Sequence, residues 1–125
     1  MPSLHPKTAA RRAAVRALNS VETTGRVLGA AIDDALQGAP DAARPFAREV
    51  ATGVLRHRAR LDWTLAPLLK KPLARLDAPV RAALRAAAYE RIVLKTPGAV
   101  VANEYSGLMR GEKLSSATGF VNAVA

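Results

Sequence analysis

Residues 10–21 read ARRAAVRALNSV, and their pattern decides the fold class. Ala14, Ala17, Leu18 and Val21 recur at the i, i+3, i+4 and i+7 spacing that places side chains on one side of an α-helix. The rest of the chain is also rich in Ala and Leu, which are good helix formers. It holds no alternating strand pattern and no hairpin turn. The sequence therefore predicts an all-α protein.

Pro and Gly residues divide the chain into about seven predicted helices. Pro6 suits the beginning of the first helix, Gly25 suits its end, and Asp77 suits the N-cap of the fifth. The expected helices cover residues 7–22, 26–37, 42–58, 61–69, 78–94 and 99–110, with a seventh beginning at Ser115 or Ser116. Since 125 residues suffice for one core and no linker or repeat interrupts them, we expect a single helical-bundle domain over residues 1–125.

The apolar positions of these helices predict the core. We expect ten buried side chains: Leu18, Val21, Phe46, Val50, Val54, Leu61, Leu65, Leu84, Tyr89 and Phe120. Trp63 also lies in an apolar helical segment, so we expect it to pack in the core rather than to stack on nucleic-acid bases. Tyr105 lies on a helix of mixed polarity, and its place stays open.

The charge of the chain indicates a polyanionic partner. There are 19 Lys and Arg against 10 Asp and Glu, a formal net charge of +9, and nucleic acid is the usual partner of such an excess. In the first predicted helix, Arg11, Arg12 and Arg16 project away from the apolar stripe without acidic partners at helical spacing. Cations near a helix N-terminus are unfavourable, so their placement there indicates a ligand. Guanidinium groups suit phosphate and unpaired bases.

We therefore predict that this helix binds RNA, through Lys7, Arg11, Arg12, Arg16, Asn19 and Thr23. The alternative is a solvated helix face. Arg56, Arg58 and Arg60 form a second cluster, which extends the RNA surface if the fold brings it beside the first helix. Otherwise these three are exposed cations near a helix C-terminus, where positive charge is favourable.

Charged residues further along the chain are expected to have structural roles. Arg81, Arg85 and Arg91 lie near acids in the predicted helices, and we expect structural ion pairs with Asp77, Glu90 or Glu49. The sequence thus concentrates its functional charge at the N-terminal helix.

No residue set suggests catalysis, a cofactor or a metal. The chain has no Cys, and its two His residues, His5 and His57, are far apart in sequence and outside metal-ligand spacing. The glycines match no phosphate-binding loop. We expect no catalytic residue, no cofactor and no metal site. No segment has the length of a membrane span or a signal-peptide core, so we also expect a cytoplasmic protein without a membrane partner.

Several short stretches follow one another in a characteristic order: residues 10–18; Phe46, Val50, Gly53 and Val54; Leu61-Asp62-Trp63; Arg75-Leu76-Asp77; Leu84-Arg85 with Tyr89; Pro97 with Val101-Ala102-Asn103-Glu104; and residues 119–124, GFVNAV. In this order the chain resembles the NusB family. That all-α fold is shared by NusB antitermination factors and the N-terminal domain of RsmB-type rRNA cytosine-5 methyltransferases. Asn103-Glu104 and the closing Phe-Val-Asn are the most specific stretches.

The resemblance implies two packed three-helix subdomains and RNA contacts from Arg11, Arg12 and Arg16. It implies either the rRNA-recognition domain of a small-subunit rRNA methyltransferase, covalently linked to a catalytic domain, or a free-standing antitermination factor that binds leader RNA with a small-subunit ribosomal protein. Ser116 stands where NusB factors carry an acidic residue of the ribosomal-protein contact, and residues 61–63 and the ending resemble the methyltransferase domain more closely. We therefore prefer the first reading and keep the second as the alternative. Tyr105 departs from both branches, which usually have Ala there.

Overall fold

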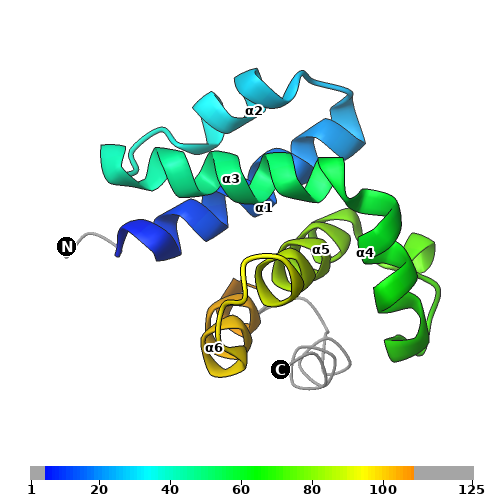
Figure 1. Cartoon of the computed structure of the whole chain (residues 1–125). Coiled ribbons are helices and arrows are strands. Elements are labelled where there is room, and N and C mark those ends of the chain that lie inside the picture. Colours follow the sequence, from blue (N-terminus) through cyan, green and yellow to red (C-terminus); the bar gives the residue numbers. More distant parts are fainter. Residues whose placement is uncertain (1–4, 109–125) are drawn as a thin grey trace.

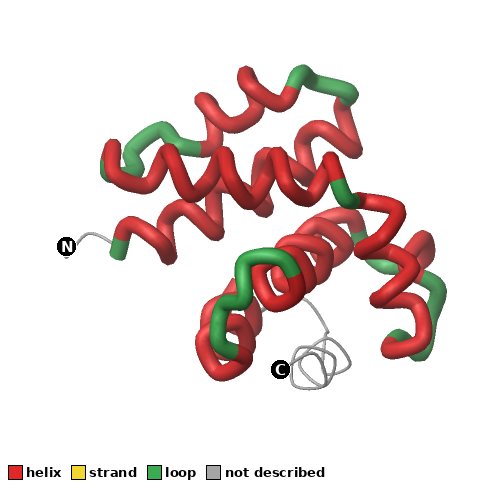
Figure 2. The backbone as a smooth tube through the Cα atoms, viewed as in Figure 1, coloured by secondary structure: helices red, strands yellow, loops and turns green. Residues whose placement is uncertain are grey.

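The structure is a computed structural model that describes residues 5–108. Within this range the chain is helical and contains no strand, so the predicted all-α class is confirmed (Figure 2). The α-helices are α1 (Pro6–Thr24), α2 (Leu28–Ala35), α3 (Arg44–Arg56), α4 (Arg58–Leu65), α5 (Ala78–Ile92) and α6 (Gly98–Leu108). Short 3-10 helices lie at η1 (Asp41–Ala43), η2 (Ala66–Leu68) and η3 (Leu73–Arg75). The predicted seventh helix, with Ser115, Ser116 and Phe120, lies outside the described residues.

The ends of α1 follow from its sequence. The His5 imidazole Nδ1 accepts a hydrogen bond from the backbone N–H of Lys7, and Pro6 occupies the first turn, where no backbone donor is needed. Gly25 ends the helix in the left-handed conformation, with φ of 73°, and its N–H bonds to the carbonyl of Val21. Both ends lie within two residues of the predicted ones.

The six helices form two groups of three (Figure 1). In one group α1 packs against α2 and α3, and in the other α5 packs against α4 and α6. The contact between α1 and α5 joins the groups. This arrangement agrees with the two three-helix subdomains implied by the resemblance.

Alanine lets α1 and α5 come close. Every residue from Ala82 to Glu90 is buried, and the inner side of α1 is lined by Ala10, Ala14 and Ala17. Small side chains allow close approach of two helix backbones, and the larger Leu and Val side chains of α3 and α4 fill the space on either side. The core is therefore built mainly of short aliphatic side chains.

Most of the predicted core is confirmed. Seven of the ten side chains are buried: Leu18, Val50, Val54, Leu61, Leu65, Leu84 and Tyr89. Val21 and Phe46 are half-buried against the core. Tyr105, whose place the sequence left open, is fully buried.

The prediction for Trp63 is wrong, because its side chain is 80% exposed. Leu61 and Leu65, four residues apart on α4, both point into the core. Trp63 lies two residues from each, roughly 200° around the helix, and so faces outward. The apolar segment that suggested burial is too short to bury both sides of the helix.

Candidate nucleic-acid interface

Four polar residues form a continuous stripe along the outer side of α1. Arg12, Arg16, Asn19 and Thr23 follow at steps of four, three and four residues, the spacing of one helix face. Arg12, Arg16 and Thr23 are exposed, and Asn19 is half-buried. Thr23 Oγ1 donates to the Asn19 carbonyl at 2.8 Å. We call these four residues the α1 stripe.

The two arginines of the stripe have no acidic partner. Neither Arg12 nor Arg16 forms an ion pair with a carboxylate among residues 5–108. By contrast, the exposed Arg26 and Arg44 pair with Asp34 at 2.5 Å and Asp33 at 2.6 Å. The guanidinium groups of Arg12 and Arg16 are thus available to an external anion.

A hollow of about 160 Å³ lies beside these two arginines. Its floor is formed by Ala9 and Ala13 of α1, and its far wall by Ala35 and the connection 37–40 that leads from α2 to η1. The lining is small and largely apolar, and both cations stand at the α1 side. Arg12 and Arg16 thus border the same hollow.

Arg11 is not part of this surface. It is 4% exposed and donates three hydrogen bonds to carboxylates. Its Nε and Nη2 contact the two oxygens of Glu90 at 2.7 and 2.9 Å, and its Nη1 contacts Glu104 Oε1 at 2.7 Å. The prediction that Arg11 projects outward beside Arg12 and Arg16 is wrong. Both partners lie on other helices, 79 and 93 residues along the chain, where helical spacing could not reveal them.

The buried carboxylate of Glu90 is the centre of this network. Besides Arg11, it accepts hydrogen bonds from the hydroxyls of Tyr105 and, at 3.0 Å, Thr96. Glu104 also accepts from Thr8 Oγ1 at 2.7 Å. These contacts tie α1, α5 and α6 together. Arg11 therefore positions α1: although it borders the hollow that Lys7 also lines, its guanidinium is already engaged by Glu90 and Glu104.

Burial and charge shift the pKa values inside the network. Burial raises the pKa of the Tyr105 hydroxyl well above its ordinary value, and the adjacent charge of Glu90 raises it further. Burial alone would lower the pKa of Arg11, but the hydrogen bond and charge of Glu90 outweigh it and raise that pKa. Tyr105 thus stays a hydroxyl donor and Arg11 stays a cation.

Lys7 lies on a different side of α1 from the stripe. It is five residues before Arg12, roughly 140° around the helix, and its Nζ lies 5.3 Å from the centroid of the Phe46 ring. It lines a wide hollow of about 620 Å³ at the N-terminal end of α1, opposite Lys95 and the α5–α6 connection. Lys7 is exposed, but the structure does not join it to the stripe in one hollow.

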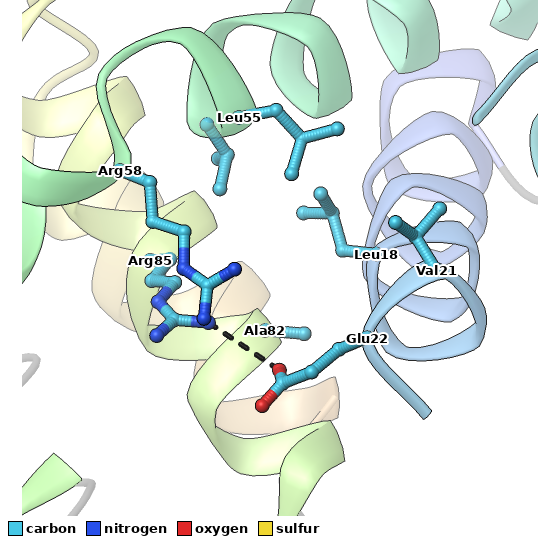
Figure 3. A pocket seen from close by; sticks show the side chains of 8 residues that line it. Leu18, Val21, Glu22, Leu55, Arg58, Ala82 and Arg85 are labelled. Atoms are coloured by element: carbon cyan, nitrogen blue, oxygen red, sulfur yellow. Dashed lines mark hydrogen bonds and ion pairs between the residues drawn. The ribbon is translucent and has the colours of Figure 1, made fainter. Parts of the chain in front are cut away.

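A second ionic network ties the end of α1 to α5 and α4. Arg81 pairs with Glu22 at 2.6 Å, and Arg85 contacts Glu22 at 3.3 Å and Asp62 at 2.8 and 3.0 Å. The predicted partners of Arg81 and Arg85 were therefore wrong, although their structural role is confirmed. Figure 3 shows the Glu22–Arg85 pair beside Leu18 and Val21.

The second basic cluster lies at the junction of α3 and α4. Arg56, Arg58 and Arg60 are exposed, and none pairs with a carboxylate in the described part of the chain. Figure 3 places Arg58 next to Arg85, near the C-terminal end of α1. The fold thus brings Arg58 beside α1, but on the side of Leu18 and Val21, away from the stripe and its hollow.

Other kinds of site find no support in residues 5–108. No group of three or more His, Asp or Glu side chains in this range could hold a metal ion. No helix of the described chain is long and apolar enough to cross a membrane. The exposed cations are the distinctive feature of the surface.

Comparison with known proteins agrees with this geometry. Residues 8–124 match the model of the NusB family. The chain belongs to the NusB family. A transcription antitermination protein NusB from Rhodopseudomonas palustris (strain BisB5) is 37% identical over 134 aligned positions, which cover 93% of this chain and 74% of that protein. Its counterpart from Bradyrhizobium sp. (strain ORS 278) is 36% identical, covering 93% and 77%. A third NusB, from Bradyrhizobium diazoefficiens, is 43% identical over a shorter alignment that covers 63% of this chain and 50% of that protein.

Solved NusB structures share the fold. NusB of T. maritima superposes with a TM-score of 0.80 at 24% identity, covering 98% of this chain and 89% of that one. A structure of the antitermination factors NusB and NusE with double-stranded RNA gives 0.80 at 24% identity, covering 95% and 92%. The curated NusB relatives described above are named as antitermination proteins rather than as enzymes. This agrees with the prediction of a non-catalytic chain, and it favours the antitermination alternative over the preferred methyltransferase reading.

Proposed function

We propose that this NusB-family chain is an RNA-binding factor of transcription antitermination that acts in the cytoplasm and assembles on leader RNA with a small-subunit ribosomal protein. The names of its relatives support this function, as does the shared fold with a NusB that was solved with NusE and RNA. The methyltransferase-domain reading rests on residues 61–63, on the chain's last motif and on Ser116 in place of an acidic residue.

The observation that carries the proposal is the pair of unpartnered arginines on the α1 stripe. Arg12 and Arg16 lie one turn apart on the same face, roughly 6 Å along the axis, so both guanidinium groups can contact phosphates of one strand. Thr23 continues the stripe with an exposed hydroxyl. The Oδ1 of Asn19 is buried, so a contact from Asn19 would use its amide nitrogen. Lys7 adds charge at the start of the helix. In this scheme Arg11 makes no RNA contact and instead holds α1 in place.

The salt dependence of RNA binding tests this assignment. Each phosphate contact contributes about −0.7 to the slope of log affinity against log salt for a single strand, so Arg12→Ala with Arg16→Ala should reduce the slope by about 1.4 in magnitude. The matched control is Arg26→Ala with Arg44→Ala. It removes the same charge from exposed residues that are already paired with Asp34 and Asp33.

Affinity for a single-stranded fragment of the ribosomal RNA leader, measured by filter binding at several salt concentrations, should fall in the first variant and stay near the wild-type value in the control. Equal losses in both variants would mean that only total charge matters, and would contradict a site on the α1 stripe. No loss in either variant would place the RNA surface elsewhere.

A further inference from the structure

Trp63 is the only Trp of the chain, and it lies in the open on α4. Its side chain is 80% exposed, while Leu61 and Leu65 on the same helix are buried. An indole is one of the largest apolar groups a protein can expose, and Trp is enriched where proteins contact their partners. The ionic networks and the core do not use it.

The surroundings of Trp63 are cationic. Arg60 lies one turn before it on the same side of α4, and Arg56 lies at the end of α3, just across the bend at His57. The single carboxylate of α4, Asp62, is held by two hydrogen bonds from Arg85. Asp62 is therefore not available to neutralise Arg60.

We propose that Trp63, Arg56 and Arg60 form a second RNA-contact surface, in which the indole stacks on an unpaired base of single-stranded RNA and the two arginines bind the flanking phosphates. The inference rests on the proposed function, because it presupposes that the chain binds RNA. It adds a surface at the α3–α4 junction, separate from the α1 stripe.

The chemistry of the face selects this occupant. Proteins commonly bind single-stranded nucleic acid through aromatic side chains beside cations. Each base has a flat face on which an aromatic ring can stack, and each phosphate carries a negative charge. A protein interface needs a broader apolar centre. Around Trp63 the exposed apolar side chains are Ala59, Ala66, Pro67 and the 42% exposed Leu68, all of them smaller than the indole and none aromatic.

The fluorescence of Trp63 reports directly on its contact. Because no other Trp contributes, the free protein should show the emission of a water-exposed indole. An adenine homopolymer of about 12 nucleotides, within the range of single-strand site sizes, should quench that emission as it binds. Heparin, a polyanion without bases, should bind through charge but leave the emission nearly unchanged.

Variants separate stacking from charge. With fluorescein-labelled homopolymer and anisotropy as the readout, Trp63→Ala should weaken binding at least fivefold, the lower end of what one stacked base contributes. Arg56→Gln with Arg60→Gln should lower the salt slope by about 1.4 in magnitude. The matched control is Val27→Ala, because Val27 is an exposed apolar side chain, 78% exposed, at the N-cap of α2. The homopolymer affinity of this variant should equal that of the wild type. Trp63→Ala should keep its thermal midpoint, because the side chain contributes nothing to the core.

The outcomes distinguish this surface from the α1 stripe. If Arg12 and Arg16 are needed for binding but the homopolymer neither quenches Trp63 nor loses affinity in Trp63→Ala, the second surface is refuted and the proposed function stands. If the RNA fails to bind at any salt concentration, both fail. If the emission of the free protein is that of a buried indole, or changes with protein concentration alone, Trp63 is covered by protein and the inference is overturned.

Discussion

Replacement of Arg11 by Ala is the sharpest test of the division between structural and RNA-binding arginines. Arg11 and Arg12 are adjacent on α1 and carry the same charge, yet Arg11 is buried in ion pairs and Arg12 is exposed. By charge alone the two are alike. The structure predicts opposite consequences for their removal.

The magnitude follows from what Arg11→Ala leaves behind. The side chain of Glu90 is 0% exposed and would lose two of its four hydrogen bonds, keeping those from Tyr105 and Thr96. Glu104 is 20% exposed and can be hydrated instead. Removing one partner of a buried ion pair costs about 3–5 kcal/mol, which is a large part of the 5–15 kcal/mol that stabilises a typical domain. A fall of the thermal midpoint on the order of 10 °C or more corresponds to this loss.

The assay is chemical and thermal unfolding followed by far-ultraviolet circular dichroism. Arg12→Ala is the matched control and should change the free energy of unfolding by about 0.5 kcal/mol or less. Combining Arg11→Met with Glu90→Leu should recover part of the loss, because neither charge is then left alone in the core. The effect on RNA affinity should be the reverse. Under conditions in which both variants are fully folded, Arg12→Ala should bind RNA more weakly than Arg11→Ala.

One result would refute this reasoning. If Arg11→Ala unfolds at the wild-type midpoint and loses RNA affinity as Arg12→Ala does, then Arg11 is open to solvent and the network with Glu90 does not hold α1. A loss of stability shared equally by both variants would point instead to a general effect of charge in the first turns of α1.

Three further outcomes follow from individual contacts. Gly53→Ala should destabilise the protein by about 1–3 kcal/mol in urea unfolding, because a Cβ there would overlap the buried ring of Tyr89 and force a core shift. Stability should fall as the pH rises above about 10, because Tyr105 binds its proton more tightly in the folded chain than in the unfolded one, and Tyr105→Phe should flatten that part of the profile. Trp63→Ala should change the free energy of unfolding by less than about 0.5 kcal/mol, and a larger loss would show that Trp63 packs against protein.

The sequence by itself determined the class of fold and most of the helix positions. Helical periodicity and the effects of Pro and Gly act over a few residues. The ends of α1 and the burial of Leu18 on its inner side could therefore be predicted from the local sequence alone. The order of motifs also pointed to the NusB family. The excess of positive charge and its concentration on α1 were equally visible, because charge is a property of composition and local spacing.

Only the tertiary structure decided which arginine does what. Arg11 lies three residues before Ala14 and seven before Leu18, on the inner side of α1, whereas Arg12 and Arg16 lie on the outer side. What the sequence does not show is that Glu90 and Glu104 come back to α1 from helices far along the chain and pair with Arg11. Trp63 shows the converse: its segment is apolar, yet Leu61 and Leu65 occupy the core side of α4 and leave the indole outside. Ion pairs and burial depend on which helices meet, and that is set by the packing of the whole chain rather than by the pattern within any one helix.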